Sequence, residues 1–147
     1  MLGHLSPDDL VETAVSPADT PHPKASMELP VHLAIYRATP AQAILHAHPP
    51  SAVALSLVEE AIVPADSEGA HILGKVPVIT AANVVASYEV AGHAASLLQA
   101  HPAVLVRGHG SFTVGGSLED ALRITTTLEA SAKILLLAKA AGWRPSQ

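Results

Sequence analysis

Cysteine is absent from the 147-residue sequence, so the chain has no disulfide framework and no thiolate zinc site. Any metal bound to it must therefore use imidazole and carboxylate ligands. Aromatic residues make up only 3% of the chain, whereas hydrophobic residues of all kinds make up 49%. We therefore expect one compact domain over residues 1–147, with a core built from Ala, Val, Leu and Ile.

Charged residues are also few, at 14%, and the net charge is −5 with histidine neutral. No basic stripe is present, which argues against a nucleic-acid partner. The longest strongly apolar run, residues 134–138, lies between Lys133 and Lys139 and is far too short to span a bilayer. The opening MLGHLSPDDL does not resemble a signal peptide. We expect a cytoplasmic protein without a membrane partner.

Hydrophobic spacing, together with Pro and Gly, divides the chain into helices and strands. A short helix is expected after Ser6, and residues 61–80 read as short β-pieces cut by Gly and Pro. Longer helices are expected over 27–38, 51–60, 83–100 and 117–142, and strands over 43–48, 103–107 and 111–114. This order, with paired strands at 103–114, predicts an α/β domain whose helices cover a mixed or antiparallel sheet.

Histidine is abundant, with nine residues, and the placement of three of them indicates a metal site. His46 and His48 lie two apart on a predicted strand, so both side chains point to the same face. His109 lies between two glycines at the end of another strand, where the backbone turns tightly. Three neutral imidazoles with an open fourth position suit a catalytic zinc ion. The alternatives are a chance His-x-His pair and a solvated turn histidine.

Three segments resemble the class II aldolase/adducin family: Glu28-x3-His32 at a helix start, LHAHPP with His46 and His48, and VLVRGHGSFTVGGSLEDAL with His109. The resemblance runs from about residue 3 to residue 142. It implies a three-layer α/β/α sandwich with a central mixed, mainly antiparallel sheet, and a C4 homotetramer with active sites at subunit interfaces. It also implies a divalent cation, Zn²⁺ or otherwise Mn²⁺ or Co²⁺, bound by the three histidines.

The same resemblance assigns Glu28 as the catalytic acid/base beside the metal. The chemistry agrees, because a retro-aldol cleavage leaves an enediolate whose charge a chelated cation spreads, while a nearby carboxylate moves protons. Without the three histidines, Glu28 would read as a first-turn acid favoured by the helix dipole. His32, one turn further on, is expected either to support the site from behind or simply to pack within its helix.

The resemblance implies an aldolase that cleaves a small sugar phosphate such as fuculose 1-phosphate. The alternatives are an epimerase or dehydratase of a pentulose phosphate with the same metal site, and a non-catalytic adducin-like assembly domain. The sequence departs from the family pattern in lacking the Gly-Asn-x-Ser and Ser-Gly segments that cradle the substrate phosphate. Lys24 and Arg107 are the positive groups expected near the site, where both could equally be solvated.

A second departure concerns the loop at residues 64–69, which has no tyrosine. Some family members bring a catalytic tyrosine on this loop into the site of a neighbouring subunit. Asp66 and Glu68 are therefore predicted to contact the substrate in its place. The alternative is that both are ordinary loop acids.

Overall fold

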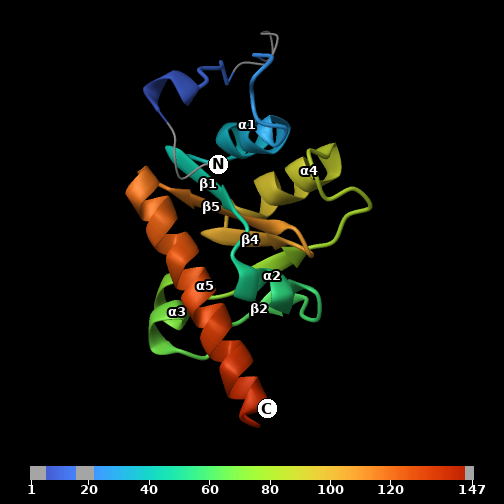
Figure 1. Cartoon of the computed structure of the whole chain (residues 1–147), viewed down its shortest axis with the longest axis vertical. Coiled ribbons are helices and arrows are strands. Elements are labelled where there is room, and N and C mark those ends of the chain that lie inside the picture. Colours follow the sequence, from blue (N-terminus) through green and yellow to red (C-terminus); the bar gives the residue numbers. More distant parts are fainter. Residues whose placement is uncertain (1–5, 16–21, 145–147) are drawn as a thin grey trace.

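The computed structural model describes residues 6–15 and 22–144, and it has three layers. The central sheet contains β1 (Ala43–Ala47), β2 (Ala61–Ile62), β3 (Val76–Ile79), β4 (Ala103–Val106) and β5 (Gly110–Gly115). One side is covered by α1 (Leu29–Ala38) and α4 (Tyr88–Leu97). The other side is covered by α2 (Pro50–Ser56), α3 (Ser67–Ile72) and α5 (Leu118–Ala140) (Figure 1). The predicted α/β/α sandwich is confirmed.

The strand order is β1-β5-β4-β3-β2, which makes neighbours of segments that are far apart in the sequence. Pairs β1–β5, β5–β4 and β3–β2 are antiparallel, and β3–β4 is parallel. The sheet is therefore mixed and mainly antiparallel, as predicted. Because β5 pairs with β1 on one side and β4 on the other, the turn between β4 and β5 lies close to the end of β1.

Each face of the sheet carries its own aliphatic core. Val31, Ile35, Val90 and Ala94 from α1 and α4 pack on the first face, together with Phe112, the one phenylalanine of the sequence. On the second face, helices α2 and α5 pack on β2, β3 and β4 through the following buried residues: Ala52, Leu55, Ile62, Val76, Ala103, Leu105, Ile124, Leu128, Ala132 and Leu135. The low aromatic content is thus accommodated by aliphatic layers, each buried between helices and sheet.

Helices α3, α4 and α5 each begin at a side-chain cap, whereas α1 and α2 have no side-chain cap hydrogen bond. Ser117 caps α5 by accepting a hydrogen bond from the Asp120 N–H at 3.1 Å, as its sequence context indicates. The short helix after Ser6 is the 3₁₀ turn η2 (Pro7–Asp9), with Ser6 and Asp9 capping each other. Among the described residues, no helix is both long and apolar enough to cross a bilayer.

The structure differs from the prediction in the bounds of two helices and in one additional helix. The helix expected from residue 83 begins at Tyr88, because Ser87 caps it and Ala86 has a left-handed φ of 52°. Residues 61–80 contain a helix, α3, which starts because Asp66 accepts a hydrogen bond from the Gly69 N–H at 2.8 Å. The helix α2 ends at Ser56, four residues earlier than expected.

Candidate metal site

Strand pairing brings the three predicted histidine ligands together. His46 lies opposite Phe112 in the β1–β5 pair, and the neighbouring pair joins Ala47 to Ser111, two residues after His109. His48 follows β1 directly. The ring centroids of His46, His48 and His109 lie 4.9, 5.0 and 5.1 Å apart, so the rings form a nearly equilateral triangle. One ring nitrogen from each residue can be chosen so that all lie within 4.8 Å of one another.

Two of the rings are oriented by backbone carbonyl groups. Nδ1 of His46 is 3.0 Å from the Ser111 carbonyl oxygen, and Nδ1 of His109 is 2.8 Å from the Val84 carbonyl oxygen. A carbonyl oxygen only accepts, so each Nδ1 carries the proton and each Nε2 keeps its lone pair. This arrangement, in which the second ring nitrogen is anchored, is typical of metal-ligating histidines.

The donor set fits a small divalent cation. Nε2 of His46 and Nε2 of His48 are 3.1 Å apart. Two imidazole nitrogens bound to one tetrahedral zinc ion at the usual distance are about 3.3 Å apart. The same separation also suits an N–H···N hydrogen bond between neutral rings. Because the site offers neutral nitrogen donors and no thiolate, zinc, manganese and cobalt all match it chemically.

The His46 ring is stacked on Phe112, with ring centroids 4.3 Å apart and an interplanar angle of 21°. Burial lowers the pKa of His46 from 6.5 to about 4, and the neighbouring His109 and His48 act in the same direction. The imidazole is therefore neutral at physiological pH, which is the form that binds a metal ion.

This low pKa predicts how the stability of the metal-free protein depends on pH. As pH falls below about 6.5, the unfolded chain protonates His46 first, while the folded chain does so only near pH 4. The free energy of unfolding should therefore decrease as pH falls through this window. Urea titrations at several pH values should show a smaller decrease for His46→Gln than for wild type. The matched control is substitution of the exposed His93 on α4, and an unaltered slope in His46→Gln would contradict the assignment.

Glu28 lies beside this cluster. It is the N-cap residue of α1 and is 6% exposed. Its Oε1 is 4.0 Å from Nε2 of His109 and accepts a hydrogen bond from the Ala86 N–H at 3.1 Å. Its Oε2 is buried and has no hydrogen-bond partner within the part of the chain that the structure describes. The carboxylate makes no cap hydrogen bond to its own helix, so it is not a simple first-turn acid.

The loop before α4 contributes to the site, which the sequence-based prediction missed. Val84 orients His109 through its carbonyl oxygen, and Ala86 donates its N–H to Glu28. The sequence pattern predicts the first turn of a helix here, in which the Val84 carbonyl group would accept a hydrogen bond from the N–H of Tyr88 and not from His109. Ser87, followed by an acid at Glu89, was the signal for the true helix start.

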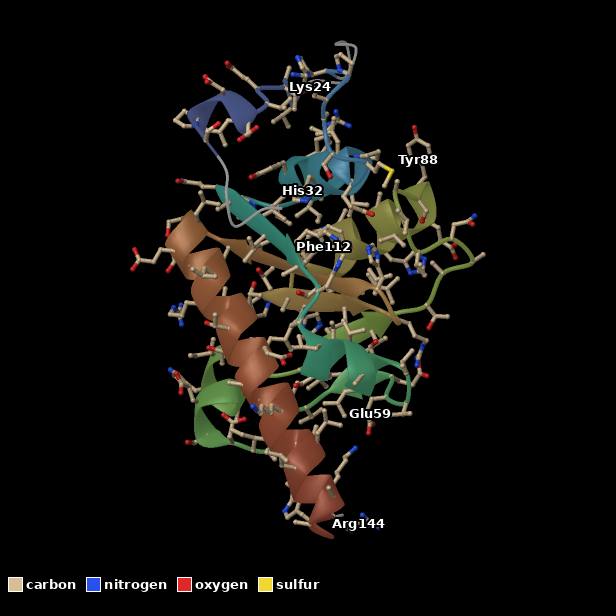
Figure 2. All side chains as sticks on the ribbon, in the orientation of Figure 1. Lys24, His32, Glu59, Tyr88, Phe112 and Arg144 are labelled. Atoms are coloured by element: carbon tan, nitrogen blue, oxygen red, sulfur yellow. The ribbon has the colours of Figure 1, made fainter. Side chains whose placement is uncertain are left out.

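His32 lies outside the histidine triangle, near His46 and Phe112. Its ring is half-buried and meets Phe112 edge-on at 5.6 Å, and it is 6.5 Å from the His46 ring. Figure 2 shows His32 and Phe112 between α1 and the sheet. Burial lowers the pKa of His32, so this ring is also held in its neutral form.

The remaining predicted residues do not join the cluster within this chain. Asp66 caps α3, and Glu68 is exposed on the first turn of the same helix. Across residues 6–15 and 22–144, no hydrogen bond or ion pair links either acid to the three histidines. Lys24 is exposed and lies beyond α1, on the side away from the sheet (Figure 2). Arg107 is not a free solvated cation, because its guanidinium group donates three hydrogen bonds.

A protein family and a solved structure are similar to this chain. The sequence model of the class II aldolase and adducin N-terminal domain matches residues 1–136. The crystal structure of L-fuculose-1-phosphate aldolase from Thermus thermophilus is 41% identical, with a TM-score of 0.90 over 97% of this chain and 76% of that one.

Two curated relatives carry other activities in their names. The 3,4-dihydroxyphthalate decarboxylase of Terrabacter sp. (strain DBF63) is 33% identical over 121 residues, which is 78% of this chain and 51% of the relative. The methylthioribulose-1-phosphate dehydratase of Methylococcus capsulatus is 32% identical over 139 residues, which is 86% of this chain and 68% of the relative. The chain thus spans about half the length of the decarboxylase.

Proposed function

Since the chain belongs to the class II aldolase and adducin family, we propose that it is a metal-dependent aldolase that cleaves a small sugar phosphate such as L-fuculose 1-phosphate. The family membership confirms the resemblance inferred from the sequence. The observation that carries the proposal is the triangle of His46, His48 and His109 with the buried Glu28 carboxylate beside it. The likeness to L-fuculose-1-phosphate aldolase supports the choice of substrate.

In this proposal, His46, His48 and His109 hold a divalent cation such as Zn²⁺. When bound, the cation supplies Lewis-acid chemistry, withdrawing charge from the oxygen atoms of the substrate. The protein fixes two of the three imidazoles in the correct tautomer through the Ser111 and Val84 carbonyl groups. His48 is more exposed than the other two ligands, so the open side of the site lies next to it.

Glu28 is the residue that moves protons in this proposal. Its Oε1 is held by the Ala86 N–H, which leaves Oε2 free to take a proton from a substrate hydroxyl group and return it to carbon. The carboxylate is nearly excluded from water, so water does not compete strongly for that proton.

A lyase acting on a different substrate is the second candidate, because relatives named as a decarboxylase and a dehydratase match the chain at 32–33% identity. A decarboxylase or a dehydratase would use a cation held by the same three histidines to withdraw charge from an oxygen atom of its own substrate. An epimerase needs the same ligands and differs in the surrounding loops. An adducin-like assembly role is less well supported, because the chain keeps all three histidines and Glu28.

The homotetramer, the cytoplasmic location and the substrate contacts of Asp66 and Glu68 stay predictions. Glu68 is exposed on the first turn of α3, whereas Asp66 is half-buried and caps that helix with Oδ1. An exposed side chain at this position is accessible to a neighbouring subunit. The family resemblance implies that this loop enters the site of that subunit.

The assay that tests the proposal compares three reactions of the zinc-loaded chain. L-fuculose 1-phosphate cleavage is followed by reduction of the released ketone phosphate in a coupled dehydrogenase reaction. Carbon dioxide release from 3,4-dihydroxyphthalate and dehydration of methylthioribulose 1-phosphate are measured in parallel. We expect kcat/KM for the sugar-phosphate cleavage to exceed the other two by about 100-fold or more. A higher value for decarboxylation or dehydration would replace the aldolase proposal.

A further inference from the structure

Helix α2 connects the two segments that supply His48 and His109. His48 is separated from the helix by a single residue, Pro49, and the helix ends at Ser56. Ser56 is fully buried and contacts the turn that carries His109, because its Oγ accepts a hydrogen bond from the Gly108 N–H at 2.9 Å. The seven residues of α2 thus span the gap between one predicted ligand and the other.

The N-terminal end of α2 is held by Glu129 of α5. The Glu129 carboxylate accepts hydrogen bonds from the Ser51 N–H at 2.9 Å and from the Ala52 N–H at 3.1 Å. These are backbone donors that a helix cannot satisfy internally, and a carboxylate is the favoured group at that end. The helix therefore has a fixed start just beyond His48.

The C-terminal end of α2 is held by Arg107. The guanidinium Nη1 donates to the Ser56 carbonyl oxygen at 2.6 Å, Nε donates to Thr80 Oγ1 at 3.0 Å, and Nη2 donates to Glu60 Oε1 at 2.7 Å. A planar guanidinium group with all three of its nitrogens engaged has little freedom to rotate. The Glu60 side chain is 89% exposed, so its ion pair adds little, and the Ser56 and Thr80 contacts define the position.

Arg107 is also adjacent in sequence to the turn that presents His109. Gly108 has a φ of 67°, and a Cβ atom there would be 3.2 Å from Leu57 just after α2, so the turn already lies tightly against this helix. The Arg107 backbone is fixed as well, because its N–H donates to the Ile79 carbonyl oxygen at 2.9 Å. The side chain and the backbone of Arg107 therefore both hold the Gly108–His109 turn in place relative to α2.

We propose that Arg107 is a positioning residue of the metal site, which fixes the separation of His109 and His48 by holding the Gly108–His109 turn against the C-terminal end of α2. The inference rests on the proposed metal site. Within the described part of the chain, the hydrogen bonds of the Arg107 guanidinium group go to Thr80, Ser56 and Glu60 and not to His46, His48 or His109. The role of Arg107 is to keep two ligand-bearing segments in register before the ion binds, so that binding does not have to order them.

The test measures Co²⁺ affinity by competition with a chromophoric chelator, and the visible absorption spectrum of the bound Co²⁺. In Arg107→Gln we expect the Kd to rise about tenfold, as for other residues that orient ligands, with a changed spectrum. Arg107→Lys, whose ammonium group can still donate to the Ser56 carbonyl, should recover most of the affinity. The matched control is Arg123→Gln, an exposed arginine on α5 paired with Asp120 at 4.0 Å, and it should bind like wild type.

A Kd within about twofold of wild type and an unchanged Co²⁺ spectrum in Arg107→Gln would overturn the proposal, even if urea unfolding showed a less stable metal-free chain. Should Arg107→Gln not fold, Thr80→Val makes a milder form of the same test, because it removes the hydroxyl oxygen that accepts a hydrogen bond from Arg107 Nε. Unchanged affinity in that variant would also overturn it. A wild-type chain that binds no Co²⁺ would overturn both this inference and the proposed function, whereas equal affinities overturn this inference alone.

Discussion

The His48→Ala variant is expected to retain less than about 0.1 divalent ion per chain, against about one for wild type, when both are reconstituted and measured by elemental analysis. The substitution leaves His46 and His109, and two imidazoles do not make a tight site for a cation that prefers three or four protein ligands. Sugar-phosphate cleavage should fall by about 10³-fold or more, because the Lewis acid is lost.

A substitution at His48 distinguishes loss of the metal from loss of folding better than a substitution at either of the other two ligands. Its side chain is exposed and follows the last residue of β1, so its removal leaves the sheet and both cores intact. The metal-free variant should unfold within about 0.5 kcal/mol of wild type. Zinc at about 100 times its Kd should stabilise wild type by about 2.7 kcal/mol and His48→Ala not at all.

The matched control is His93→Ala, which removes an exposed histidine from α4. It should keep about one ion per chain, and full cleavage activity. If His48→Ala also kept one ion per chain, the histidine triangle would not be the metal site and the aldolase proposal would fail with it.

The sequence predicted the histidine site because two simple rules apply there. Alternation along a strand places His46 and His48 on one side, and two glycines around His109 mark a tight turn. That the turn and the strand end meet is a consequence of β5 pairing with β1. Local spacing does not specify that pairing, and the family resemblance implies only that the three histidines bind one ion.

The loop at residues 80–87 escaped prediction because its sequence, TAANVVAS, has apolar residues that also suit a helix. The structure instead uses the left-handed φ of Ala86 to end the loop, a conformation that alanine rarely adopts. Its N–H is then directed to Glu28, which offsets part of the strain. Tertiary contacts stabilise a strained backbone conformation of this kind, and the hydrophobic periodicity of the sequence does not indicate it.

At Asp66 and Glu68 the local sequence does carry a signal, but that signal is ambiguous. Gly69 and the nearby prolines predict irregular structure here, but Asp66 is a helix cap. Gly69 is buried against α5, where an added Cβ atom would lie 2.1 Å from Ser131 Oγ. The glycine therefore serves close helix packing, which a single sequence does not distinguish from a turn.

Glu28→Gln is expected to lower kcat for sugar-phosphate cleavage by about 10²- to 10⁴-fold, while the chain keeps about one metal ion. The amide oxygen of glutamine can still accept the hydrogen bond from the Ala86 N–H, so the loop before α4 should stay in place. What the variant loses is a group that takes up and returns a proton. Steady-state kinetics and metal analysis on the same preparation measure both effects, and KM should change much less than kcat.

Glu89→Gln provides the matched control for this experiment. Glu89 also accepts a hydrogen bond from the loop before α4, through Ala82 N–H at 3.2 Å, but it is exposed and lies outside the histidine cluster. Its substitution should leave kcat within about twofold of wild type, because it removes a charge from the surface without touching the site. A kcat for Glu28→Gln that matched this control would make Glu28 a structural acid. Loss of the metal together with activity would instead make Glu28 a fourth ligand, and its proton-transfer role would have to be assigned to another group.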